Sequence, residues 1–228
     1  ARYIFTCLSK TTTNIFKEED DPILEYNYDD GTRIEPKYFV PTIPMILVNG
    51  AIGVGTGYST DIPCFNPVDI VKNVKRVMKG EPQVPMVPWY NKFTGTITKV
   101  EENKFESKGV CEIDQRNPKR VVITELPIGK WSDDYREFLE GLRDDKNSWI
   151  DSMSNHNTDE TVRIEIMFKE GYMQKVDIYK YLRLTSTINT TNMVLWDENG
   201  KIRKYNSPEE IISEFCKVRK EYYEKRRV

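Results

Sequence analysis

A glycine-rich stretch, residues 41–63, has the spacing that points most directly to contact with another molecule. Glycine stands at alternate positions, including Gly53 and Gly55, and this spacing lets a backbone approach another molecule closely. The branched apolar side chains of Ile52 and Val54 alternate with these glycines, where an exposed loop usually carries polar residues. We interpret the stretch as a loop that inserts a small apolar wedge into a partner.

Two other interpretations of this stretch are open. A phosphate-binding loop of a dinucleotide enzyme would need the pattern G-x-G-x-x-G, but Tyr58 occupies the position of the third glycine. The Walker pattern is absent too, because no Gly-Lys-Ser/Thr follows. A glycine-rich turn between core elements, without any partner, would also account for the composition.

The composition is that of a globular protein with one large domain or two smaller ones. The 228 residues are 38% hydrophobic and 31% charged. No apolar run approaches the roughly 18 residues that a membrane span needs, and no signal-peptide pattern is present, so we expect no membrane partner. The net charge of −2 argues against binding nucleic acid through bulk charge, although local basic surfaces remain compatible with it.

The residues that usually bind metals do not form a ligand set in the sequence. The four cysteines are scattered without metal-ligand spacing, and they resemble reduced residues of an intracellular protein. The single histidine, His156, lies in a polar segment with no cysteine nearby, and we interpret it as structural or simply exposed. The sequence therefore predicts no metal site.

The elements around the glycine stretch predict an α+β protein. Residues 2–16 have apolar positions at roughly helical spacing, which predicts a short strand end or turn passing into an amphipathic helix. A hairpin with its turn at Asp30-Gly31 follows, which is how a winged helix ends. A helix is predicted from Asn66-Pro67 to Gly80. Its polar face is basic through Lys72, Lys75, Arg76 and Lys79, so this face either contacts DNA or is merely solvated.

The remainder of the chain is predicted to hold strands, three helices and a second hairpin. In chain order these are strands 93–100 and 120–126, helix 133–143, strand 161–168, helix 171–184, a hairpin turning at Asn199-Gly200, and a helix from Ser207.

The last of these helices combines an apolar seam with many basic residues. Apolar residues have the spacing of a coiled-coil seam, at Ile211, Phe215, Val218 and Tyr222. Lysines and arginines, Arg219 among them, make the helix basic. We expect this helix to continue past residue 228 and the chain to be part of a longer protein.

Four motifs together resemble one family, the type IIA DNA topoisomerases, in the form found in eukaryotes and large DNA viruses rather than the bacterial gyrase form. They are ARYIFT, IEPKYFVPTIPMILVNGAIGVGTGYSTDIP, ITELP followed by Trp131, and NMVLWDENGKIRKYNS. The resemblance covers essentially the whole chain. It implies the end of a winged-helix domain over residues 1–40, a tower domain with a DNA-bending loop over 41–205, and the start of a coiled-coil helix over 206–228.

The resemblance places the family's nucleophile on Tyr3 and its phosphate-contacting arginine on Arg2. A tyrosine hydroxyl has a pKa near 10 and needs help to lose its proton. A guanidinium beside it can hold a phosphate oxygen and offset the charge that develops at phosphorus. The phosphotyrosyl ester keeps the energy of the broken phosphodiester, so resealing the strand needs no nucleotide.

The resemblance also makes the glycine stretch, with Gly53 and Gly55, part of the DNA interface. The family's intercalating isoleucine falls on Val54, which is one methylene smaller and makes a shallower wedge. Ile52 stands where eukaryotic members usually carry an acidic residue, so it either shares the wedge or packs inward. Unstacking a base step costs a few kcal/mol, which the contacts of bent DNA offset.

The whole enzyme that the resemblance implies is an ATP-dependent homodimer acting on double-stranded DNA, an isomerase. Each protomer attacks one strand, and a second duplex passes through the opened gate. The sequence lacks the acidic cluster that binds Mg²⁺ in the family and lacks an ATP motif, so we expect both sites outside this chain and no cleavage by the chain alone. The expected location is the nucleus, or a cytoplasmic viral factory if the source is a large DNA virus.

Rival functions are weaker. A catalytically inert DNA-bending or scaffold protein of the same fold would be expected to lack the Arg2-Tyr3 pair. A nucleotide-dependent oxidoreductase or kinase would need the motifs that fail above. A tyrosine recombinase also forms phosphotyrosine, but its additional arginines and histidine have no counterparts in the sequence.

Overall fold

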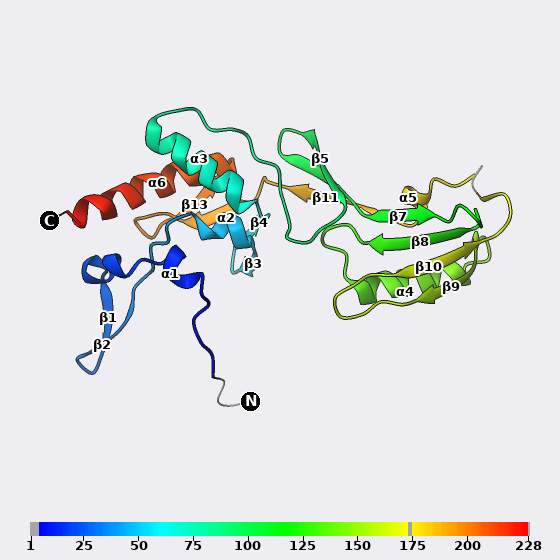
Figure 1. Ribbon diagram of the computed structural model, residues 1–228, viewed down its shortest axis with the longest axis horizontal. Helices are drawn as coiled ribbons and strands as arrows, with labels where there is room; N and C mark the ends of the chain where they lie inside the picture. Colours follow the sequence, from blue (N-terminus) through cyan, green and yellow to red (C-terminus); the bar gives the residue numbers. More distant parts are fainter. Residues whose placement is uncertain (1–4, 173–174, 228) are drawn as a thin grey trace. The chain divides into compact units, whose positions relative to one another are not determined.

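The computed structural model of the chain describes residues 5–172 and 175–227. Contacts divide it into two compact units, the described residues of 1–86 with 190–228, and Val87–Asn189. The chain mixes helices and strands, as predicted (Figure 1). Among the described residues, no helix combines the length and apolar character that crossing a membrane requires. The division into winged-helix, tower and coiled-coil ranges stays a prediction.

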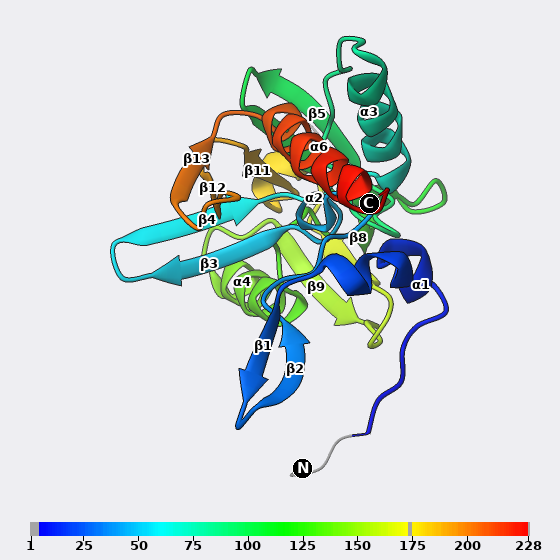
Figure 2. The same cartoon turned by 90° about the vertical axis from the view of Figure 1, so that its left-hand side faces the viewer.

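The first unit contains three two-stranded antiparallel sheets and a set of helices. Its elements are α1 (Thr12–Ile15), the 3-10 helix η1 (Glu18–Ile23), β1 (Tyr26–Asp29), β2 (Thr32–Pro36), α2 (Met45–Asn49), β3 (Ala51–Gly55), β4 (Tyr58–Ile62), α3 (Pro67–Lys79), β12 (Met193–Trp196), β13 (Ile202–Tyr205) and α6 (Pro208–Lys225). Both the β1–β2 and the β3–β4 hairpins project from the body of this unit in Figure 2.

The core of the first unit is built by α2, α3, α6, the base of the β3–β4 hairpin and the β12–β13 hairpin. Its buried members include Leu47, Phe65, Ile70 and Ile212. Helix α3 has the predicted ends, because the Asn66 side chain accepts a hydrogen bond from the Val68 amide and Gly80 adopts the left-handed conformation. Helix α6 begins as predicted, with the Ser207 side chain capping the Glu210 amide.

A buried charge cluster joins η1 to α6. The Asp20 carboxylate accepts hydrogen bonds from Arg219 Nη1 and Arg226 Nε, both at 2.6 Å. Asp20 is 3% exposed and Arg219 is 1% exposed. Arg219 Nη1 also donates to the Val40 carbonyl at 3.3 Å, and both guanidinium groups lie over the Tyr223 ring. Arg219, which the sequence shows only as one basic residue of α6 among several, therefore points into the protein.

The second unit contains two antiparallel sheets and two helices. Its elements are β5 (Thr96–Glu101), β6 (Lys104–Lys108), β7 (Val110–Ile113), β8 (Arg120–Glu125), α4 (Ser132–Asp144), β9 (Ile150–Asn155), β10 (Ile164–Phe168), α5 (Ile178–Tyr181) and β11 (Thr185–Asn189). The sheets have the orders β7-β8-β10-β9 and β11-β6-β5.

The four-stranded sheet buries one face and exposes the other. Val121 and Ile123 of β8 and Ile164 and Ile166 of β10 are buried and alternate with less buried neighbours. They pack against α4 residues such as Leu139. Figure 1 shows α4 lying along this sheet. The amphipathic alternation of these strands therefore fixes which face the helix covers.

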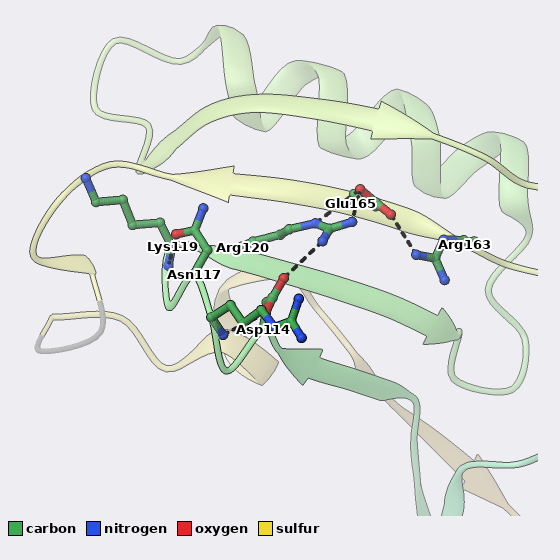
Figure 3. Close-up of polar contacts among 7 residues, drawn as sticks. Asp114, Asn117, Lys119, Arg120, Arg163 and Glu165 are labelled. Carbon is green, nitrogen blue, oxygen red and sulfur yellow. Dashed lines mark hydrogen bonds and ion pairs between the residues drawn. The ribbon is translucent and has the colours of Figure 1, made fainter.

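The opposite face of the sheet carries a row of charged side chains (Figure 3). Arg120 lies between two carboxylates, with Nη1 2.9 Å from Asp114 Oδ2 and Nη2 2.6 Å from Glu165 Oε2. Arg163 reaches the other Glu165 oxygen at 2.8 Å. Hydrogen bonds from Arg120 and then Arg163 hold the pKa of Glu165 below its usual value. The alternating charges make this face a solvated ion-pair network.

Two of the sequence predictions are wrong in the described residues. Of the helix predicted over 171–184, the residues described by the structure form an α-helix over α5 alone, four residues long; Arg183 then adopts a left-handed backbone and the chain turns into β11. Within residues 5–16 the α-helix is limited to Thr12–Ile15, so the predicted amphipathic helix is about one turn, and Leu8 is exposed rather than packed. The hairpin turn at Asp30-Gly31 is confirmed, with both residues at positive φ.

Candidate nucleic-acid interface

The glycine-rich stretch forms a hairpin rather than the predicted loop. Strands β3 and β4 pair in register from Ala51 opposite Ile62 to Gly55 opposite Tyr58. The two-residue turn between them ends in Gly57, whose φ of 81° favours glycine. The stretch therefore presents its side chains on two defined faces.

The two branched apolar residues of this hairpin are almost fully exposed. Ile52 is 87% and Val54 is 91% exposed. Because they are two residues apart on one strand, their side chains point to the same face. Burying such a side chain would stabilise the fold by about 1.5–3 kcal/mol. Because both are exposed, this stabilisation is absent from the chain's own fold. Ile52 therefore does not pack inward, and it stands beside Val54 as a second exposed apolar side chain.

The glycines of the stretch have different physical roles. Gly50 has a φ of 66°, and a Cβ there would lie 2.7 Å from the Ile62 carbonyl oxygen, so the fold itself requires glycine. At Gly53 and Gly55 the nearest atoms to such a Cβ are 3.9 and 3.8 Å away, which is ordinary contact. The fold does not need glycine at these two positions, which fits a surface that another molecule approaches closely.

The base of the hairpin is fixed to the core of its unit. The Phe65 amide donates to the Leu47 carbonyl at 2.7 Å, and both side chains are fully buried. Beside β4, the Asp61 amide donates to the Asn192 carbonyl at 2.8 Å, and Asn192 Nδ2 bonds Ser59 Oγ at 3.0 Å. A rigid base and a projecting tip together hold the exposed residues in a set position.

Cys64 follows the hairpin and has a structural role. Its thiol donates to the Asn49 carbonyl at 3.2 Å. Burial raises the pKa of the Cys64 thiol, which keeps it neutral and unreactive at physiological pH. Cys64 therefore supports the turn after α2 and offers no nucleophile.

An exposed aromatic residue lies at the hairpin tip, at a position that the sequence pattern marks only as a departure from the G-x-G-x-x-G motif. Tyr58 is largely exposed and pairs with Gly55, next to the turn. Aromatic rings at such a position can stack on bases or contact a sugar. The signal was available in the sequence as a tyrosine directly after Gly57.

The predicted basic face of α3 is partly engaged in ion pairs. Lys72 Nζ lies 3.0 Å from Asp69 Oδ1, and Arg76 Nη1 lies 3.7 Å from Glu81 Oε2. Lys75 is exposed and forms no ion pair with the residues that the structure describes. In Figure 2, α3 lies away from the tip of the β3–β4 hairpin. The structure therefore does not bring Lys72, Lys75 and Arg76 to the wedge, and their contact with DNA stays a prediction.

The predicted nucleophile and its arginine partner, Tyr3 and Arg2, lie outside the described residues. Within residues 5–172 and 175–227, no group of three or more histidine, cysteine, aspartate or glutamate side chains could hold a metal ion. Asp30 lies in the β1–β2 turn with a φ of 44°, which matches its interpretation as a turn residue. The described residues therefore do not fit a magnesium site.

The chain is similar to proteins of one family along its whole length. The family model for the A subunit of DNA gyrase/topoisomerase IV matches residues 1–228. DNA topoisomerase 2 of Arabidopsis thaliana is 44% identical over 240 residues, covering 100% of this chain and 16% of the relative. DNA topoisomerase 2 of Plasmodium falciparum is also 44% identical, over 231 residues, with the same two coverages. The chain thus spans about a sixth of the length of these relatives.

A solved structure agrees with the sequence matches. It is described as the crystal structure of the Plasmodium falciparum topoisomerase II DNA-binding, cleavage and re-ligation domain. The TM-score is 0.91 at 43% identity, and the match covers 99% of this chain and 31% of the solved one. The chain therefore belongs to the type IIA DNA topoisomerase family, in the form that eukaryotic DNA topoisomerase 2 represents, as the sequence motifs predicted.

Proposed function

We propose that this chain is part of the cleavage core of an ATP-dependent type II DNA topoisomerase. The observation that carries the proposal is the exposed pair Ile52 and Val54 on a rigidly anchored hairpin, in a chain that matches this family from end to end. The solved relative is named for DNA binding, cleavage and re-ligation. An apolar pair on an open strand is suited to bending the DNA that is to be cut.

The two apolar side chains disrupt base stacking, and new contacts between the protein and the bent DNA offset that cost. Val54 and Ile52 enter the duplex from the minor-groove side, and each partly unstacks a base step, at a cost of a few kcal/mol per step. Burial of each side chain between bases returns about 1.5–3 kcal/mol, and the bent duplex contacts more of the protein. The open backbone at Gly53 lets the DNA approach the strand itself.

The covalent step belongs to Tyr3 and Arg2. The deprotonated Tyr3 oxygen attacks a backbone phosphorus, forming a 5′-phosphotyrosyl bond, while the bond from phosphorus to the 3′ oxygen breaks and that oxygen takes up a proton. Arg2 holds a non-bridging phosphate oxygen and stabilises the charge that develops there. Religation reverses the step, with the 3′ hydroxyl as the nucleophile.

The remaining features of the proposal concern the complete protein. Two protomers pair so that two nucleophiles cut two strands, and the enzyme works in the nucleus, or in a viral factory if the source is viral. As the family resemblance implies, magnesium and ATP are bound by parts of the protein outside this chain. The basic face of α3 contributes contacts to flanking DNA through Lys75.

The test uses the complete protein and end-labelled duplex DNA with magnesium. After denaturation with detergent, the parent protein should retain DNA in a covalent adduct, and Tyr3→Phe should retain none. Tyr28→Phe is the matched control, because Tyr28 is an exposed tyrosine on the β1–β2 hairpin, and it should form as much adduct as the parent. Equal adduct from the parent and Tyr3→Phe would refute the assignment. DNA that is bound and bent but never attached would favour an inert DNA-bending protein.

A further inference from the structure

The second unit contains a cavity with an excess of positive charge that the proposed function does not use. The cavity has a volume of about 490 Å³ and is walled by β6, α5 and the start of β11. Four cations line it, Lys108, Lys130, Lys180 and Arg183, against two carboxylates, Glu106 and Asp177. None of the four cations forms an ion pair with another residue in the part of the chain that the structure describes. They are therefore available to a ligand of opposite charge.

The walls hold these cations in position. The Lys108 ammonium lies 3.8 Å from the Tyr179 ring centroid, and the Arg183 guanidinium lies 4.5 Å from that of Phe138. Arg183 has a φ of 49°, a left-handed backbone that side chains other than glycine rarely adopt. Such strained residues concentrate at ligand sites, where the surrounding structure fixes them.

Two hydrogen bonds tie the turn that carries Arg183 to its surroundings. The Leu184 amide donates to the Tyr179 carbonyl at 2.8 Å, closing the turn after α5. The buried Tyr135 hydroxyl donates to the Leu182 carbonyl at 2.6 Å. The left-handed residue is thus held between two buried leucines, and its side chain is preorganised for a ligand.

A second cavity adjoins the first and is aromatic. Its volume is about 260 Å³, and Lys130 and Arg183 line both cavities. Trp131 lines the second cavity and is 75% exposed. Its large apolar ring therefore remains in contact with solvent instead of being buried. A flat ring that reached this cavity could stack on the indole while a charged group attached to it reached the cations.

We propose that the two cavities form one nucleotide-binding site, with phosphate bound by the four cations and the base stacked on Trp131. Phosphate is the biological anion that lysine and arginine together bind best, and base–aromatic stacking tolerates any base. The ligand is either a free nucleoside phosphate or an unpaired nucleotide of a DNA strand. The inference does not rest on the cleavage proposed above.

The test is photocrosslinking to the complete protein carrying Tyr3→Phe, so that no adduct can arise from strand cleavage. One probe is 8-azido-ATP, and the other is a single-stranded oligothymidylate with one 5-iododeoxyuridine. Adducts are mapped to peptides by mass spectrometry, which separates this site from any nucleotide site elsewhere. We expect an adduct on the peptide that contains Trp131 with at least one probe, and the probe that reacts identifies the source of the ligand.

Two variants decide the result. Lys130→Glu with Lys180→Glu replaces two exposed cations and should lower the adduct at Trp131 at least tenfold. Lys99→Glu, an exposed cation on β5 that lines neither cavity, should leave the adduct unchanged. Both proteins should retain the parent's thermal midpoint, because the replaced side chains are on the surface. No adduct at Trp131 with either probe, or an adduct that the double variant does not reduce, would overturn the proposal.

Discussion

Removing the Asp20 carboxylate should loosen the attachment of η1 to α6. Asp20→Asn keeps the shape of the side chain but leaves Arg219, which is 1% exposed, without its buried counter-charge. Breaking a buried ion pair by removing one partner costs about 3–5 kcal/mol. Because asparagine can still accept one hydrogen bond, we expect the lower end, about 3 kcal/mol, which corresponds to roughly a hundredfold change in the opening equilibrium.

The assay is hydrogen–deuterium exchange of α6 amides in the complete protein. The amides around Arg219 should lose about a hundredfold of their protection in Asp20→Asn. Glu25→Gln is the matched control, since the Glu25–Lys37 pair at 2.9 Å is exposed and exposed pairs contribute little to stability. A second variant, Asp20→Asn with Arg219→Met, should recover protection by removing the uncompensated charge. Equal protection in Asp20→Asn and Glu25→Gln would refute the reasoning.

The same contact predicts an acid-sensitive attachment. Burial by itself raises the pKa of Asp20, but the hydrogen bonds and charges of Arg226 and Arg219 outweigh it, so the net pKa lies below the usual value. A lowered native pKa stabilises the folded state above the unfolded pKa of about 4, and this stabilisation is lost as the pH falls through the native pKa. In Asp20→Asn, α6 protection should not show this loss on acidification.

The hairpin and the cysteines give three more predictions. Val54→Ala should reduce the bend of a doubly labelled duplex, measured by energy transfer, whereas Val54→Ile should bend the duplex at least as much as the parent protein. Val68→Ala is the control, because Val68 is an exposed valine on α3, and it should leave the bend unchanged. Gly50→Ala should lower the free energy of unfolding by more than about 2 kcal/mol, measured from urea unfolding, because the backbone there, at φ 66° and ψ 176°, is nearly restricted to glycine. An unchanged urea midpoint would contradict this. Iodoacetamide at pH 8 should modify the exposed Cys7 quickly but spare Cys216, whose pKa burial raises to about 11.

The elements with local signals were predictable from the sequence. Helix α3 has asparagine at one end and glycine at the other, and the structure uses both as caps. The β1–β2 turn needs positive φ at two residues, and Asp30-Gly31 supplies them. Helix α6 starts where serine and proline indicate. In each case the residues that decide the conformation are neighbours in the sequence, so no knowledge of tertiary contacts was needed.

The elements that depend on distant contacts were not predictable in this way. The buried state of Arg219 depends on Asp20, 199 residues away in the sequence, and a lysine- and arginine-rich helix normally suggests a solvated surface. The apolar periodicity near 171–184 suggested a long helix, but the turn at Arg183 and the pairing of β11 with β6 end it early. Tertiary pairing here overrides local helical preference.

The candidate site was partly predictable. The types and spacing of Ile52 and Val54 alone predict an apolar pair that meets a partner. The same pattern predicts a loop rather than the paired strand that displays them, because alternating glycines weaken a strand signal. The sequence leaves open whether Ile52 packs inward, because that depends on which side of the strand the core covers. The roles of Tyr3 and Arg2 came entirely from family resemblance, because one tyrosine among 13 carries no signal of its own.

The register of β3 also sets a length scale for the proposed wedge. Side chains two residues apart on one strand, such as Ile52 and Val54, are separated by about 6.6–6.8 Å, whereas stacked base pairs lie about 3.4 Å apart. If the strand lies along the duplex axis, the two side chains match gaps two steps apart, with one intact step between them. The spacing of the two side chains on the strand would then fix which base steps are deformed, namely two steps separated by one intact step. Sequence preference should accordingly appear as a pair of flexible steps at that fixed separation.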